Sequence, residues 1–269
     1  DVCSSDLLLY GWLKRQHIFT PTTALWTALL WLLHPAASEA VTYIAGRSVS
    51  LATTFLLAAL YIQHGDHPGK RYWLAGLTAC ALLVRETAWI FPVLLALSAW
   101  LNGANFRQLG LTLRPTLLVL LAGVAILLAV TPYPQLLEVS FASRSLTQQL
   151  LGQINAYSYL LIQPALLLTP NIDPDIAIPN QLDSYLFAKG LILLTLAGVC
   201  LWRVLRHRCW LAGGMIWLLV CLLPTNSLIP RLDLANDRHL YPALIGLSWI
   251  VVLTVKNLRI QQPLLLGLW

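Results

Sequence analysis

Charged residues are scarce in this chain. Only 10% of its 269 residues are Asp, Glu, Lys or Arg, whereas about 25% is usual for soluble domains. Hydrophobic residues make up 58% of the chain, and its mean hydropathy is +0.71. A single soluble core cannot enclose that much apolar side chain, so a soluble enzyme and a disordered tail are excluded. The composition predicts an all-α protein whose helices form a polytopic transmembrane bundle.

Paired cysteines are also missing. The five cysteines stand singly, without CxxC or Cys/His spacing, which excludes a disulfide scaffold and gives no sign of a metal site. Glycine and proline, at 15 residues each, are close to their average share, so collagen-like and low-complexity chains are excluded as well. We expect neither a metal nor a resident cofactor.

We expect both ends of the sequence to be truncated. Residues 1–7 read like the translation of a common sequencing adapter, and we expect a scar there. The apolar run 8–13 stops at Lys14, and the run 263–269 is one or two turns long, whereas a span needs about 20 residues. We therefore expect a single membrane domain over residues 8–269, with an incomplete helix at each end.

Eight apolar runs lie between these ends and predict eight full membrane spans. No fixed-period repeat and no long hydrophilic linker separates them, which favours one domain. The runs cover residues 19–33, 49–63, 72–84, 87–101, 115–131, 185–202, 209–223 and 240–255.

Lys and Arg are distributed unevenly between alternate loops, and basic loops stay on the cytoplasmic side of a membrane. We therefore expect the richer set inside and the poorer set outside, on the periplasmic face of a bacterial inner membrane. All acids beyond residues 1–7 except Asp66 belong to the outer set, so polar chemistry is expected at the outer face. The inner set is Lys14, Arg15, Lys70, Arg71, Arg107, Arg114, Arg203, Arg206, Arg208, Lys256 and Arg259; the outer set is Arg47, Arg85, Arg144, Lys189, Arg231 and Arg238.

The longest outer segment covers residues 132–184. Its short apolar stretch, 157–168, is expected to lie on the membrane or dip into it rather than to cross it. The segment also contains 171–175, where Asp173 and Asp175 flank a proline. Two acids at this spacing could hold a cation, but Asn and Asp beside proline also simply form turns.

Two outer loops combine an acid with a base. Glu39, Tyr43 and Arg47 stand at i, i+4 and i+8, so in a helix they would share a face and pair. Arg85 and Glu86 are adjacent between two apolar runs. A charge there costs free energy unless it is paired or faces a cavity. Both groups are candidates for a site, and a structural ion pair is the alternative for each.

The outer loop 223–242 is the densest in polar residues. Asp237, Arg238 and His239 are consecutive and directly precede an apolar run. Arginine offers a planar fork for phosphate oxygens, and histidine can add a donor or titrate near neutral pH. The alternative is a solvated helix start capped by Asn or Asp.

Four motifs in this order resemble one family. They are His-Pro followed by Ser-Glu-Ala-Val-Thr-Tyr-Ile and Gly-Arg (34–47), Arg-Glu (85–86), Leu-Leu-Pro-Thr-Asn-Ser (222–227) and Asp-Arg-His-Leu-Tyr-Pro (237–242). Over about residues 8–255 the chain resembles the membrane O-mannosyltransferases that carry tetratricopeptide repeats, and their bacterial relatives, in the GT-C superfamily of glycosyltransferases.

The resemblance implies an enzyme that transfers a sugar from a polyprenyl-phosphate donor to a hydroxyl of a protein, glycan or lipid. It implies that Arg238 and His239 contact the donor phosphate, and that other residues line or support the cavity. Donor, acceptor and bilayer are the expected partners, and nucleic acid is not. The supporting residues would be Glu39, Arg47, Arg85, Glu86, Asp237 and Tyr241.

In this family the usual catalytic base comes from an outer loop that would precede Leu8. We therefore expect this chain to be inactive by itself, with Glu39 as the first substitute for the base. A lipid-linked glycan ligase, a noncatalytic scaffold and a secondary transporter or flippase remain as alternatives. A transporter should carry charges near the middle of its helices and show inverted repeats, whereas charges here collect at the ends of apolar runs.

Overall fold

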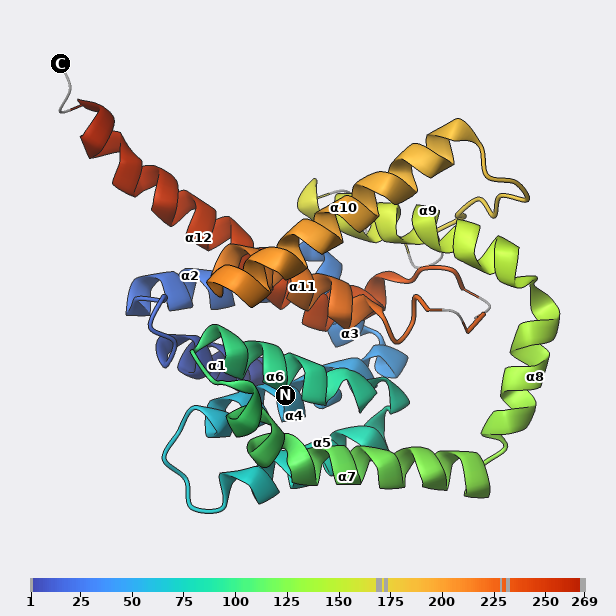
Figure 1. Ribbon diagram of the computed structural model, residues 1–269, viewed down its shortest axis with the longest axis horizontal. Coiled ribbons are helices and arrows are strands. Elements are labelled where there is room, and N and C mark those ends of the chain that lie inside the picture. Colours follow the sequence, from blue (N-terminus) through green and yellow to red (C-terminus); the bar gives the residue numbers. More distant parts are fainter. Residues whose placement is uncertain (1, 168–170, 172–173, 228, 231–232, 267–269) are drawn as a thin grey trace.

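The computed structural model describes residues 2–167, 171, 174–227, 229–230 and 233–266, and all regular structure in these ranges is helical (Figure 1). The expected all-α class is therefore confirmed. The α-helices are α1 (Val2–Lys14), α2 (Pro21–Leu32), α3 (Ser38–Thr42), α4 (Arg47–Gln63), α5 (Lys70–Val84), α6 (Phe91–Leu101), α7 (Phe106–Val130), α8 (Tyr133–Ser143), α9 (Leu146–Ala165), α10 (Ser184–His207), α11 (Trp210–Leu222) and α12 (Leu240–Leu266). The 3-10 helices are η1 (Pro35–Ala37), η2 (Ile44–Gly46), η3 (Glu86–Ile90) and η4 (Asp237–His239).

Each predicted apolar run contains a helix, but the structure does not show eight full spans. In the described ranges, three helical stretches are long and apolar enough to cross a membrane: Phe106–Val130, Ser184–His207 and Asp237–Leu258. Other helices are shorter, and α2 has only 12 residues. At about 1.5 Å per residue such a helix reaches about 18 Å, less than the hydrocarbon thickness of about 30 Å.

Tryptophans form the centre of the bundle, where α1, α11 and α12 meet. The ring of Trp12 stacks on that of Trp217 at 5.6 Å between centroids, and both contact Trp249. The Trp249 indole N–H donates to the Trp210 carbonyl at 2.8 Å. Large rings bury much apolar surface while their N–H groups need a partner, so this cluster fixes how the three helices pack.

One end of the bundle gathers basic residues. We call it the basic end; it comprises the loops 14–20, 64–69, 101–106 and 207–209. Hydrogen bonds join these loops to one another or to neighbouring helix ends: Arg15 to the Tyr61 carbonyl, Lys256 to the Ile18 carbonyl, Arg208 to the Ala104 carbonyl, and Asn102 to Gln16. Four loops of the set richer in Lys and Arg therefore lie together, and the side of the membrane that they face stays a prediction.

The segment 132–184 is more structured than expected. Instead of one short helix over 157–168, it contains α8 and the 20-residue α9. Helix α9 begins early because the Ser145 side chain caps it and Gln148 returns the bond to the cap. Helices α7, α8 and α9 run around one side of the bundle (Figure 1).

The structure also continues α1 through residues 2–7, where we expected a scar. The Ser5 hydroxyl lies 3.4 Å from the Tyr241 hydroxyl of α12. Tyr241 is fully packed between α1 and α2, with its ring 4.8 Å from that of Trp31.

Candidate active site

Two cavities adjoin at the end opposite the basic end. The inner cavity measures about 40 Å³ and contains Arg85 and Thr87 among mostly apolar side chains. The outer cavity measures about 380 Å³ and contains Asp233 and Arg238. His239 and Thr225 line both cavities, so His239 lies where the two cavities meet.

The loop between α11 and η4 is built around one buried amide. The Asn226 side chain donates to the Leu234 carbonyl at 2.8 Å and to Gln153 of α9 at 3.2 Å. The backbone carbonyl of Asn226 accepts the Tyr157 hydroxyl at 3.1 Å, and the Gln149 side chain donates to the Ser227 carbonyl at 2.9 Å. Polar residues on the inner face of α9 therefore hold this loop, and with it the residues that follow, in place.

The buried side chain of Asp237 holds η4 in place. The side chain is completely buried, and its Oδ2 accepts the backbone N–H of Asn171 at 2.9 Å and the Gln163 amide at 3.3 Å. The Tyr159 hydroxyl lies beside the same carboxylate. Burial, the charge of Asp237 and this contact raise the pKa of Tyr159 to about 12, so the phenol stays protonated.

Arg238 and His239 are thereby placed at the outer cavity. The Arg238 guanidinium lies 3.5 Å from the half-exposed carboxylate of Asp233, and an exposed pair of this kind contributes little stability. Its buried Nε has no hydrogen-bond partner among the described residues. A donor of the guanidinium therefore remains available to a bound anion.

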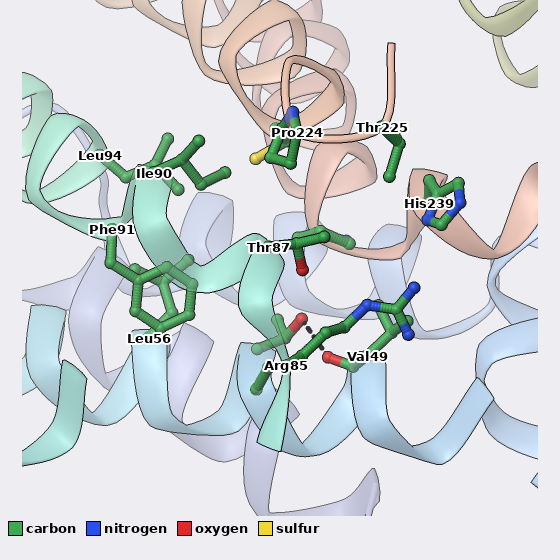
Figure 2. Close-up of a pocket in the computed structure, with 14 residues that line it drawn as sticks. Val49, Leu56, Arg85, Thr87, Ile90, Phe91, Leu94, Pro224, Thr225 and His239 are labelled. Carbon is green, nitrogen blue, oxygen red and sulfur yellow. Dashed lines mark hydrogen bonds between the residues drawn. The ribbon is translucent and has the colours of Figure 1, made fainter. Parts of the chain in front are cut away.

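Arg85 approaches His239 from a distant part of the chain. Figure 2 shows its guanidinium extending into the inner cavity toward the imidazole. The side chain is steered by a 2.9 Å hydrogen bond from Nη1 to the Ser48 hydroxyl. Glu86, the neighbour with which we paired it, is exposed and lines neither cavity, so of the two residues only Arg85 belongs to the site.

The predicted face shared by Glu39, Tyr43 and Arg47 is wrong. Helix α3 ends at Thr42 and Tyr43 is extended, so the chain turns before α4 begins. Glu39 is buried, whereas Tyr43 and Arg47 are exposed. The i, i+4, i+8 rule holds only within one continuous helix.

Glu39 instead lies beside Arg238. Burial raises the pKa of its carboxyl group, the charge and backbone N–H of Arg238 oppose this, and the charge of Asp237 reinforces it. That N–H approaches without reaching hydrogen-bond geometry, and neither carboxylate oxygen has a hydrogen-bond partner among the described residues. A buried carboxylate without donors is costly. Glu39 lines neither cavity, but it lies next to Arg238, which lines the outer one.

The remaining candidates lie apart. Tyr241 packs against Trp31 and lines neither cavity. Asp175 is exposed and away from both cavities, while Asp173 lies outside the described residues. No group of three or more His, Cys, Asp or Glu side chains that could hold a metal ion occurs among the residues that the structure describes.

Sequence reasoning missed the polar face of α9 and the fixed imidazole of His34. Gln149, Gln153 and Tyr157 stand at i, i+4 and i+8, a helical spacing that could have revealed the face. The Nδ1 atom of His34 accepts the Ala36 N–H, and its Nε2 bonds the Pro164 carbonyl at 3.2 Å. Burial lowers the pKa of His34, which agrees with a neutral ring that links η1 to α9.

The comparisons with known proteins give no match: no family model, no curated protein and no solved structure is similar to this chain. The case for a function therefore rests on the geometry of these residues.

Removing donors from Asp237 should loosen the site loop. We expect Tyr159→Phe to lower the free energy of unfolding by about 1–2 kcal/mol, because a buried carboxylate loses a partner. Hydrogen–deuterium exchange should rise in residues 223–239. Tyr185→Phe, at an exposed position of α10, is the control and should change neither quantity; equal exchange in the two variants would contradict the anchoring role.

Proposed function

We propose that this chain is the membrane part of a GT-C-type glycosyltransferase that takes a sugar from a polyprenyl-phosphate donor and transfers it to a hydroxyl acceptor. The observation that carries the proposal is the convergence of Arg85, Arg238 and His239 on adjoining cavities. These residues come from separate parts of the chain but meet at one end of an apolar helical bundle. Such a site suits an anion that is attached to a lipid.

The chemistry of the leaving group explains the cations. When the bond between the sugar and the phosphate breaks, negative charge develops on the phosphate oxygen. The Arg238 guanidinium would bind that phosphate through its fork, while His239 and Arg85 would add donors or positive charge from the junction of the cavities. Preorganised donors of this kind stabilise the transition state more than the ground state.

The acceptor hydroxyl needs a group that takes its proton. Glu39 is our candidate within the described residues, because its oxygens are buried and meet hydrogen-bond geometry with no donor there, although the backbone N–H of Arg238 lies close by. Asp237 also has a raised pKa and an unpartnered Oδ1 among the described residues, but the Asn171 N–H and the Gln163 amide hold its Oδ2 and fix this carboxylate in the site loop. We therefore assign Asp237 to positioning and Glu39 to proton transfer.

Lipid access would come along α8. Leu136 and Val139 of this helix line the outer cavity opposite Arg238, so a lipid chain can lie against them while its phosphate reaches the guanidinium. We further propose that the shorter apolar helices also cross the bilayer, giving eight spans with the site on the periplasmic face. Local thinning of the bilayer and flanking aromatic residues accommodate short spans.

The test is sugar transfer in membranes that contain the native protein, with radiolabelled polyprenyl-phosphate sugars from a lipid extract as donors. We expect label on a protein, glycan or lipid acceptor, and at least a tenfold lower rate with Arg85→Ala because a positive charge at the leaving group is lost. Glu86→Ala is the matched control. Transfer of a long preassembled glycan would indicate a ligase instead, and movement of labelled lipid across the membrane without transfer would indicate a flippase.

A further inference from the structure

A second group of charged residues lies at the basic end, far from the candidate site. Arg15 follows α1, and Lys70 and Arg71 begin α5. The only acid in the connecting loop 64–69 is Asp66. The proposed transfer reaction uses none of these residues.

The Arg15 guanidinium is held in a fixed position. It stacks on the Tyr61 ring at 3.6 Å from the centroid and donates to the Tyr61 carbonyl. It also lies against Gly65, where an added Cβ would be 2.7 Å from Arg15 Nη1 and 2.8 Å from His67 Cδ2. The side chains of Arg15 and His67 therefore both lie against Gly65, and a larger residue at this position would overlap them.

Lys70 completes the group from the start of α5, where its Nζ is 3.5 Å from the Gln63 carbonyl. His64 lies close to these charges, and its Nε2 is 2.9 Å from the Ser98 hydroxyl. Burial and then the charges of Lys70 and Arg15 lower the pKa of His64 to about 4. The imidazole is thus neutral at physiological pH, and the positive charge of the group resides on the arginines and lysine.

Aromatic residues place this group at the surface of a bilayer. Tyr72 and Trp73 follow directly and are 61% and 59% exposed, and Arg71 lies over the Tyr72 ring at 4.7 Å. Exposed Tyr and Trp beside basic residues are typical of the membrane–water interface. The cations therefore lie at the level of lipid headgroups rather than in bulk water.

We propose that Arg15, Lys70 and Arg71 form a binding site for the phosphate of an anionic phospholipid. Charge complementarity carries the choice of ligand, because Arg15, Lys70 and Arg71 lie in or beside a region of the chain whose only acid is Asp66. Each Lys or Arg near a membrane surface strengthens the attraction to anionic lipid about fivefold. The site is independent of the proposed transfer reaction.

The test uses the full chain in nanodiscs of phosphatidylcholine, with or without phosphatidylglycerol. Tryptophan fluorescence measures thermal unfolding, and native mass spectrometry measures retained lipid. We expect phosphatidylglycerol to raise the Tm and to remain bound. The double variant Arg15→Gln/Lys70→Gln should bind it on the order of 30-fold more weakly, and the exposed Arg71→Gln, which leaves the packing intact, about fivefold.

The control is Arg107→Gln/Arg114→Gln, which removes the same charge at exposed positions of α7 outside the proposed site and should weaken phosphatidylglycerol binding less than Arg15→Gln/Lys70→Gln does. Inorganic phosphate added to phosphatidylcholine nanodiscs distinguishes a free anion from a headgroup. An equal loss in the control, equal stabilisation by inorganic phosphate, or no response of wild type to phosphatidylglycerol would each overturn the proposal.

Discussion

Replacing Arg238 with alanine is expected to slow sugar transfer by the native protein about 30- to 1,000-fold, which corresponds to about 2–4 kcal/mol of transition-state stabilisation. The loss should appear mainly in kcat, because charge on the leaving phosphate develops only as the bond breaks. Initial rates at saturating donor concentration measure this effect. Purified protein with an unchanged Tm is required for the comparison.

The Arg238→Lys variant should recover only part of the rate, since it keeps the charge but loses the planar fork. Asp233→Asn is the matched control: it removes the 3.5 Å ion pair at the same guanidinium but leaves the positive charge. We expect it to change the rate less than threefold, as for other exposed pairs. Wild-type turnover by Arg238→Ala would refute the phosphate-binding role.

Composition and apolar runs were sufficient to predict an all-helical membrane protein, because the bilayer demands long apolar helices. They did not predict how long each helix is. Helix α7 begins at Phe106, nine residues before the predicted run at 115, since Asn105 and Gln108 form a capping box in a polar stretch. Caps are read from hydrogen bonds, whereas hydropathy detects only the apolar middle of a helix.

That four of the basic loops share an end of the bundle was predicted, because consecutive apolar helices return the chain to the same end; the side of the membrane which that end faces stays a prediction. The contact between Glu39 and Arg238 was not, because 199 positions of sequence separate them and only tertiary packing of α3 on η4 brings them together. The predicted partner, Arg47, was assigned by helical spacing across a chain that turns at Tyr43. Local periodicity thus gave the correct residue types with the wrong partner.

The helix contact that supports the site is formed by two glycines. Gly214 of α11 faces Gly246 of α12, and a Cβ added at Gly246 would lie 2.5 Å from the Gly214 carbonyl oxygen and 3.0 Å from Trp217. Small residues allow membrane helices to approach this closely. The atom nearest to the added Cβ belongs to the backbone, so no rotation of a side chain relieves the overlap.

Gly246→Ala is therefore expected to lower the free energy of unfolding by about 1–3 kcal/mol, as overpacked cores do, even though alanine favours helix over glycine by about 1 kcal/mol. The control is Gly76→Ala in α5, where no atom lies within 4 Å of the added Cβ. Only the higher helix propensity of alanine should act there, so the free energy of unfolding should stay equal or rise. Thermal unfolding followed by tryptophan fluorescence measures both, since separation of α11 and α12 breaks the contact between Trp217 and Trp249. A Tm for Gly246→Ala equal to that of Gly76→Ala would show that the two helices do not pack at this distance.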